Sequence, residues 1–533
     1  MLRPTALCAA LVVLLGAALI APQAGAQTEA ALRISIQADP TTLDPALTDD
    51  PTGTALLQDV YTPLLEVTAL GQVKPFTAKS WTVSPDGRTY RFILRDGLKF
   101  QNGQAVTAND VKYSLDRLAS PKLNSPNAEL LLTPIEGYQD EQAGKAPGLR
   151  GVRVVSPTEL EIKVDRPSEG DLLVRLAHVA SSIVSRESVE QGGQEWGTTH
   201  ANGTGAFRVV QWSLRNQIVL AANPAYFGGA PKIQRIVLQI VPDPNVDVEK
   251  YEAGELDIVQ VPGSEYTRLR RDPKLSKEIV EYNRASTTFL ALNTFAYPPF
   301  KDARIRRAIA LAVNRPEIVK AVFVGLYQPA NEILPPGLPG YHPLPAIAYN
   351  PSKARSLLAE AGYPGGKGLP PLLLGPNPRG FGPREAAEVV AAMIQQNLGI
   401  DTHVQILDIA KWRSDMRRRT AFAAVTGWTA DIADPNDYLF ALFASKAPFN
   451  YFSGYVNPAY DKMVDAANHE RTRDAVLRKM AEVERFLVFD DVGVLPIYHV
   501  REVILKKPYV RDLTLTPYGL GFLEHLATAS IVK

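Results

Sequence analysis

Two hydrophobic periodicities alternate along this chain of 533 residues, and that alternation limits the choice of fold. Residues 32–36, 89–94 and 233–240 largely alternate apolar and polar side chains, which is the two-residue period of a half-buried strand. Residues 385–398 repeat apolar side chains at helical spacing, end at a glycine, and lead into a new alternating stretch at 400–407. Strands that alternate with helices predict an α/β fold in which helices wrap a sheet.

Other segments carry readable helix ends or one apolar face. Asp302 can cap a helix over 303–313, and Pro316 fits the first turn of a second helix. Apolar side chains three or four residues apart predict another helix over 476–487, and residues 421–428 are predicted to form a strand. The apolar faces of all these elements are expected to pack into hydrophobic cores.

Length and composition indicate a globular chain with at least two domains. A single hydrophobic core stops growing at about 250–300 residues, well short of this chain. Hydrophobic residues make up 46% and charged residues 21%, so the chain can bury sizeable cores. Its net charge of +1 offers no basic surface for the phosphates of DNA or RNA, and no nucleic-acid partner is expected.

The first residues have the layout of a secretory signal peptide. Arg3 precedes an apolar run over 6–20 and a small-residue stretch that ends at Ala26. Residues 1–26 are therefore predicted to be removed after Ala26, which places the mature chain in the periplasm. A membrane anchor is the alternative, although the run is shorter than the roughly 20 residues of a spanning helix. Cys8 is the sole cysteine, so its removal would exclude thiolate catalysis, disulfides and cysteine-bound metals.

Motifs of catalysis and cofactor binding are absent from the sequence. The seven histidines lie more than five residues apart, so none forms the H-x-x-x-H pair of a helical metal site. The sequence contains no G-x-S-x-G elbow, Walker loop or G-x-G-x-x-G turn. Gly203-Thr204-Gly205 is too short to indicate a phosphate site. We therefore expect no enzyme, no cofactor and no metal, although a secreted hydrolase whose triad comes from distant positions stays an alternative.

Six segments in order resemble one family. They are Thr42-Leu43-Asp44-Pro45, the stretch 81–116, the stretch 202–207 (NGTGAF), the stretch 253–258 (AGELDI), the stretch 293–315, and the stretch 428–438 (WTADIADPNDY). They match motifs of the family 5 bacterial extracellular solute-binding proteins, which include the oligopeptide-, dipeptide- and nickel-binding receptors of ABC importers. The third segment departs from the family pattern, because Ala206 and Phe207 stand where Pro and Tyr are usual.

The resemblance implies a type II periplasmic-binding-protein fold, with two lobes that close over a ligand and an extra domain inserted in lobe I. The implied divisions are residues 27–58, 183–285 and 505–533 for lobe I, residues 59–182 for the inserted domain, and residues 286–504 for lobe II. The implied function is that of a monomeric substrate-binding component that captures short peptides and delivers them to the permease subunits of an ABC importer. The same role for a nickel chelate, haem, an opine or an oligosaccharide is an alternative, and a periplasmic sensor is a further one.

Three residues are implied to touch the ligand. Asp431 occupies the family position that pairs with the α-ammonium of a bound peptide; its alternative role is an Asx-turn in an exposed loop. Trp428 either packs against the ligand backbone or belongs to the core. Arg379 lies where dipeptide-binding members carry an arginine for the ligand carboxylate, and its alternative is a solvated loop. Nearby, Asp434 is expected to serve the turn before a proline, and Asp437 to remain solvated.

Overall fold

The structure is a computed structural model that describes residues 31–167, 171–378, 382–447, 449–470 and 472–532. The predicted signal peptide (1–26) and Arg379 lie outside the described residues. In the described part of the chain, no helix combines the length and apolar character needed to cross a membrane.

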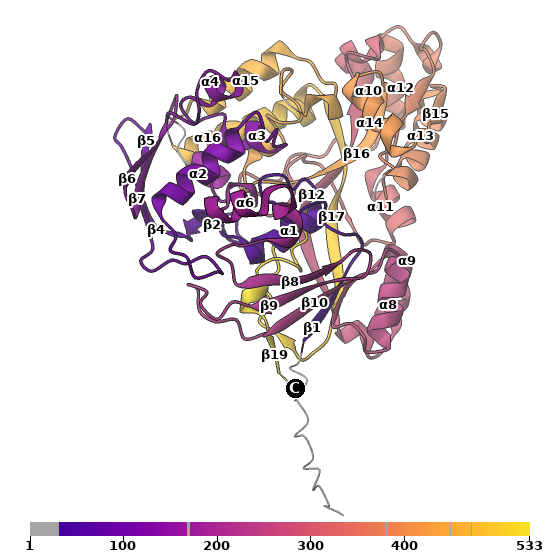
Figure 1. Ribbon diagram of the computed structural model, residues 1–533. Coiled ribbons are helices and arrows are strands. Elements are labelled where there is room, and N and C mark those ends of the chain that lie inside the picture. Colours follow the sequence, from indigo (N-terminus) through magenta and orange to yellow (C-terminus); the bar gives the residue numbers. More distant parts are fainter. Residues whose placement is uncertain (1–30, 168–170, 379–381, 448, 471, 533) are drawn as a thin grey trace, which may run out of the picture.

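A mixed sheet of eleven strands runs through the molecule (Figure 1). Its order is β15-β14-β16-β12-β17-β11-β1-β10-β9-β8, and β13 pairs with β17 beside this path. The strands are β1 (Leu32–Ile36), β8 (Phe207–Ser213), β9 (Gln217–Ala222), β10 (Arg235–Ile240), β11 (Ile258–Gln260), β12 (Ile279–Leu292), β13 (Gln328–Pro329), β14 (Leu372–Leu374), β15 (Thr402–Val404), β16 (Ala423–Thr429) and β17 (Val494–Lys506).

The two longest strands, β12 and β17, join the two halves of this sheet. They pair antiparallel along most of their length, and the register shifts between Asn283 and Thr287 of β12. On one side of that irregularity, the end of β17 pairs with β11; on the other side, the end of β12 pairs with β16. We call the half with β1 and β8–β11 the first lobe, and the half with β14–β16 the second lobe.

The first lobe packs its strands around one hydrophobic core. Side chains of β1, β9 and β10 meet the helix α1 (Pro51–Val60) and the C-terminal residues Phe522, Leu523 and Leu526 there. The remaining elements of this region are α6 (Arg186–Gly192), α7 (Trp196–Thr199), α8 (Pro244–Glu252), α9 (Gly263–Arg271), β18 (Val510–Arg511) and β19 (Ser530–Ile531). The C-terminal segment therefore belongs to the first lobe by its packing, although it follows the whole second lobe in sequence.

A separate four-stranded sheet forms a small domain beside the first lobe (Figure 1). Its strands, in the order β4-β5-β7-β6, are β4 (Ala78–Val83), β5 (Thr89–Leu94), β7 (Glu159–Lys163) and β6 (Val152–Ser156). The helices α2 (Ala108–Ala119), α3 (Ala128–Leu132), α4 (Tyr138–Gln142) and α5 (Asp171–Arg175), together with the hairpin β2 (Leu65–Val67) and β3 (Val73–Pro75), complete it. Ile432 and Ala433 of the second lobe enter its hydrophobic core, so that core spans the boundary between the lobes.

The second lobe surrounds its strands with helices. These are α10 (Ala303–Ala312), α11 (Arg315–Phe323), α12 (Pro351–Glu360), α13 (Pro383–Leu398), α14 (Ile409–Arg417), α15 (Pro458–Asn468) and α16 (Arg473–Arg485). Asp302 caps α10 by accepting a hydrogen bond from the backbone of Arg304, and Gly399 ends α13 at a φ of 70°. Both ends agree with the sequence predictions.

The predicted strands are found, with some shifted ends. Strands β1 and β5 coincide with the predictions, and β10 begins two residues later than predicted. The alternating stretch at 400–407 forms only the three residues of β15, because it pairs with the equally short β14 on one side. The parallel pairing of β14 and β15 around α13 confirms a sheet wrapped by helices.

Candidate functional site

Two cavities lie between the lobes, next to the end of β16. The first, which we call the loop cavity, has a volume of about 90 Å³. It is lined by Thr54, Gln58, Pro63, Glu66, Val67, Phe76, Val174, Ala177, His178, Val179, Ala430, Asp431, Ile432, Ala433, Thr516, Tyr518, Gly519, Glu524 and His525. The second, which we call the hinge cavity, has a volume of about 1140 Å³ and is lined by the ends of β1, β11, β12, β16 and β17.

The two cavities are neighbouring parts of one cleft. Gly427 and Thr429 of β16 line the hinge cavity, and the next two residues, Ala430 and Asp431, line the loop cavity. The helix α1 and the C-terminal segment 516–525 likewise contribute residues to both. The cleft therefore follows the point where β16 leaves the sheet, and ligands in open α/β sheets commonly bind beyond such strand ends.

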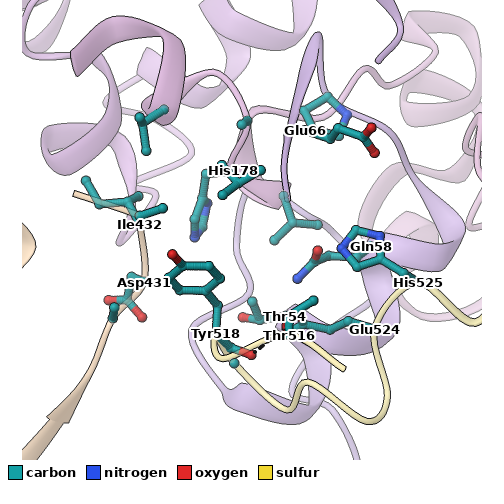
Figure 2. A pocket seen from close by; sticks show the side chains of 18 of the residues that line it. Thr54, Gln58, Glu66, His178, Asp431, Ile432, Thr516, Tyr518, Glu524 and His525 are labelled. Carbon is teal, nitrogen blue, oxygen red and sulfur yellow. Dashed lines mark hydrogen bonds between the residues drawn. The ribbon is translucent and has the colours of Figure 1, made fainter. Parts of the chain in front are cut away.

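Asp431 stands in the wall of the loop cavity. In Figure 2 its carboxylate lies on the loop of the second lobe, across from Tyr518 and Glu524 of the first lobe. Asp431 is an exposed residue that opens to the cavity, and the protein around the cleft partly desolvates its carboxylate. This desolvation raises the pKa of Asp431 to about 6. No ion pair of Asp431 is found within the described residues, which leaves the carboxylate available to a cationic ligand.

Asp437 holds the backbone of this loop from behind. Its Oδ2 atom accepts one hydrogen bond from the backbone nitrogen of Asp431 and another from Nε1 of Trp428, each at 2.9 Å. The residue is 0% exposed, and burial raises the pKa of Asp437 well above its usual value. The prediction that Asp437 remains solvated is wrong, because the short helix Pro435–Asp437 turns the side chain inward beneath the loop.

Trp428 links this carboxylate to an aromatic cluster. Its ring lies 5.1 Å from the ring of Phe449 and 5.5 Å from that of Phe452, between ring centroids. Its indole N–H is committed to Asp437. These contacts give Trp428 a place in the core of the second lobe, and a direct contact with the ligand stays a prediction.

Asp434 and Arg379 complete the residues singled out in the sequence. Asp434 is buried and accepts a hydrogen bond of 2.7 Å from the backbone of Asn436, which confirms its role in the turn; it also pairs with Arg473. Arg379 lies outside the described residues. Asn377 and Pro383, on either side of it in sequence, line the hinge cavity.

Sequence reasoning missed several polar groups of the loop cavity. Glu66 and Glu524 add two further carboxyls, and burial raises the pKa of both, that of Glu524 to about 7. Burial lowers the pKa of His178 to about 4 and also lowers that of His525, so both imidazoles are neutral at pH 7. The described lining contains no lysine or arginine, and the cavity is therefore acidic. The single acid in the apolar run Phe522-Leu523-Glu524 was a signal that could have been noticed.

Metal binding finds no support in this geometry. No group of three or more histidine, cysteine, aspartate or glutamate side chains is arranged to hold a metal ion in the part of the chain that the structure describes.

Comparison with known proteins relates the chain to solute receptors. Residues 72–450, more than half of the chain, match the middle region of the bacterial extracellular solute-binding proteins, family 5. A probable di/tripeptide-binding protein 5 of Pseudomonas aeruginosa is 29% identical over 94% of this chain and 96% of its own length. Heme-binding protein A of Haemophilus influenzae is 28% identical over 87% of this chain and 85% of its own. Among solved structures, the murein tripeptide binding protein MppA of Escherichia coli superimposes with a TM-score of 0.79 at 28% identity, covering 94% of this chain and 98% of that one.

Proposed function

We propose that this chain, which belongs to family 5 of the bacterial extracellular solute-binding proteins, captures short peptides and delivers them to the permease of an ABC importer. The family membership rests on the match over residues 72–450, and the predicted type II periplasmic-binding-protein fold is confirmed by the likeness to solved receptors. The relatives named for di/tripeptides and for a murein tripeptide support a peptide as ligand.

The observation that carries this proposal is the exposed carboxylate of Asp431 in a cavity lined by both lobes. A peptide brings an α-ammonium group, and that group loses its water when the cleft closes, so it requires an ionised partner. The pKa of Asp431, raised to about 6, leaves the carboxylate largely ionised at pH 7 even before a cation arrives. A neutral sugar in this place would leave the charge without a partner.

Two further contacts are proposed around that pair. Arg379 is proposed to bind the ligand carboxylate through its two-pronged guanidinium, and the hinge cavity beside Asn377 and Pro383 offers room for the rest of the peptide. Trp428 is proposed to support the site, either against the ligand backbone or through its hydrogen bond to Asp437. The protein is proposed to bind its ligand without transforming it.

The remaining proposals concern the chain as a whole. Cleavage after Ala26 would release a monomer into the periplasm, and two lobes would close over the ligand. The proposed divisions are 27–58, 183–285 and 505–533 for lobe I, 59–182 for the inserted domain and 286–504 for lobe II. The separate four-stranded sheet supports the inserted domain, and the packing of the C-terminal segment on β1, β9 and β10 supports its place in lobe I.

Calorimetry tests the role of Asp431. Removing one member of a buried ion pair costs about 3–5 kcal/mol, which corresponds to roughly a hundred- to several-thousand-fold in affinity. Asp431→Asn and N-acetylation of a tripeptide should each cause a loss of this size, and their combination should add little. Asp474→Asn neutralises an exposed acid at the start of α16 and should leave the affinity unchanged. Equal affinity of wild type and Asp431→Asn would refute the ammonium role.

Native mass spectrometry of protein purified without refolding tests the ligand class. A co-purified peptide mass supports the proposal. A haem mass would instead favour haem as the ligand, as the name of Heme-binding protein A suggests for that relative. A nickel chelate, an opine or an oligosaccharide would each favour the corresponding alternative ligand. Conversion of an added peptide during incubation would indicate a hydrolase, and capture of a dedicated protein partner in place of a permease would indicate a sensor.

A further inference from the structure

The loop cavity carries a second carboxylate that comes from the opposite lobe. Glu524 lies in the C-terminal segment, whose neighbours Phe522, Leu523 and Leu526 pack in the core of the first lobe. It is 2% exposed. Its Oε2 atom accepts a hydrogen bond of 2.7 Å from Oγ1 of Thr516, while its Oε1 atom has no donor in bonding geometry. The backbone of Gly519 lies close to Oε1. A buried carboxylate oxygen without a donor calls for a partner, and a cationic group bound in the cavity would supply one.

The protein itself does not neutralise this carboxyl. Asp59 on α1 is close to it, but burial raises the pKa of Asp59 to about 8, so that carboxyl is mostly neutral at pH 7; Gln58 and the backbone of Leu520 likewise contribute only neutral groups. Arg284 of β12 is near enough to favour the ionised form, but it pairs with Glu502. Tyr282, the other titratable group that faces Glu524, is neutral at pH 7 because burial and Glu502 raise its pKa. The negative charge of an ionised Glu524 is therefore only partly compensated by the protein.

The volume of the cavity restricts what can reach it. A water molecule needs at least about 10–15 Å³ of such space, so the 90 Å³ of the loop cavity holds several waters or an unbranched aliphatic chain. Figure 2 shows Tyr518 between the loop that carries Asp431 and the segment that carries Glu524. A slender aminoalkyl chain can pass an aromatic ring of this kind, and it contacts the ring face favourably.

We propose that the loop cavity selects ligands with two cationic centres, one paired with Asp431 and the other with Glu524. This inference rests on the proposed function, and it specifies a peptide whose first residue carries a basic, unbranched side chain. The two carboxyls come from opposite lobes and line the same cavity. A ligand with two cations neutralises both carboxyls. Its second cation therefore pairs with Glu524 and also favours the closed form of the protein.

Two tripeptides of equal length test this selectivity. Lys-Ala-Ala and norleucine-Ala-Ala share the α-ammonium and nearly the same side-chain length, but only the first has a side-chain amine. A charge-assisted hydrogen bond should make wild type bind the lysine peptide about 10- to 100-fold more tightly. Glu524→Gln keeps an acceptor for Thr516 and should remove this preference, while its affinity for the norleucine peptide stays within about threefold. Glu388→Gln, an exposed acid on α13 that pairs with Arg384, should preserve the preference.

The pH dependence of the preference gives a second readout. Glu524 must be ionised to pair with an amine, and its pKa of about 7 predicts that the preference of wild type rises between pH 6 and 8. The affinity ratio of the two peptides isolates this effect, because both share the titration of the α-ammonium. Equal binding of both peptides by wild type overturns the proposal, as does loss of the preference in Glu66→Gln but not in Glu524→Gln. If neither peptide binds wild type, the proposed peptide function itself fails.

Discussion

Replacing Asp437 separates the support of the loop from the charge of Asp431 that we propose binds the ligand. In Asp437→Ala, the backbone N–H of Asp431 and the indole N–H of Trp428 both lose their acceptor. An unpaired buried donor costs about 1–3 kcal/mol, and Trp428 is partly accessible, so the free energy of unfolding should fall by roughly 2–5 kcal/mol. The loop should also lose its fixed position, and peptide affinity should fall with it.

Asp437→Asn should behave differently. Burial raises the pKa of Asp437 well above its usual value, so the native group resembles a neutral acid, which asparagine imitates in shape and charge. Its amide oxygen can still accept both hydrogen bonds, and unfolding stability should stay within about 1 kcal/mol of wild type. Chemical denaturation at pH 7 measures the free energy of unfolding of both variants, and unchanged m-values would show that the unfolding transition is comparable. Equal destabilisation by Asn and Ala would show that Asp437 is ionised in the native protein and that the reasoning is wrong.

Two further predictions follow from buried groups of the second lobe. Glu484 is fully buried and its pKa is raised to about 8, so the free energy of unfolding should fall as pH rises from about 4.5 through 8. In chemical denaturation, Glu484→Gln should be as stable as wild type near pH 4.5 and more stable by roughly 3–5 kcal/mol at pH 9. Parallel pH profiles of the two proteins would contradict this prediction. Ile432 is 3% exposed in the core of the small domain, so Ile432→Ser should favour the open form and raise the radius of gyration in X-ray scattering, which ligand should lower again. As a control, Ile406→Ser changes a residue of the second lobe that is 52% exposed, and it should leave the scattering profile unchanged. An equal change in both variants would show that the contact of Ile432 with the small domain does not hold the lobes together.

The regular elements of the fold could be predicted because their signals are local. Asp302 before α10 and Gly399 after α13 act on neighbouring backbone groups, so the sequence around each suffices to place the helix end. The extent of β15 could not be predicted in this way. An alternating stretch forms a strand only as far as a partner strand runs beside it, and that partner, β14, comes from residues about 30 positions earlier.

The site shows the same division between local and distant causes. The sequence around Asp431 predicted a polar group at the end of a strand, and the structure places it there. The burial of Asp437 could not be predicted, because a Pro-Asn-Asp turn gives the same local signal whether its last side chain faces water or the protein interior. What the local sequence lacks is the distant packing around Asp437: Trp428 donates its indole N–H to the buried carboxyl and itself packs against Phe449 and Phe452.

This arrangement allows one loop to carry two aspartates with different roles, one that supports the backbone and one that we propose binds the ligand. Asp437 faces the interior, where a carboxyl is stable mainly in its neutral form and can serve as a rigid acceptor for the loop backbone. Asp431, six residues earlier, faces a cavity from which only a closed cleft removes bulk water. Its charge is therefore retained until a cation takes the place of that water. Because Asp437 holds the backbone beneath it, the carboxylate that we propose binds the ligand should need little reorganisation on lobe closure, and less of the binding free energy should be lost in ordering it.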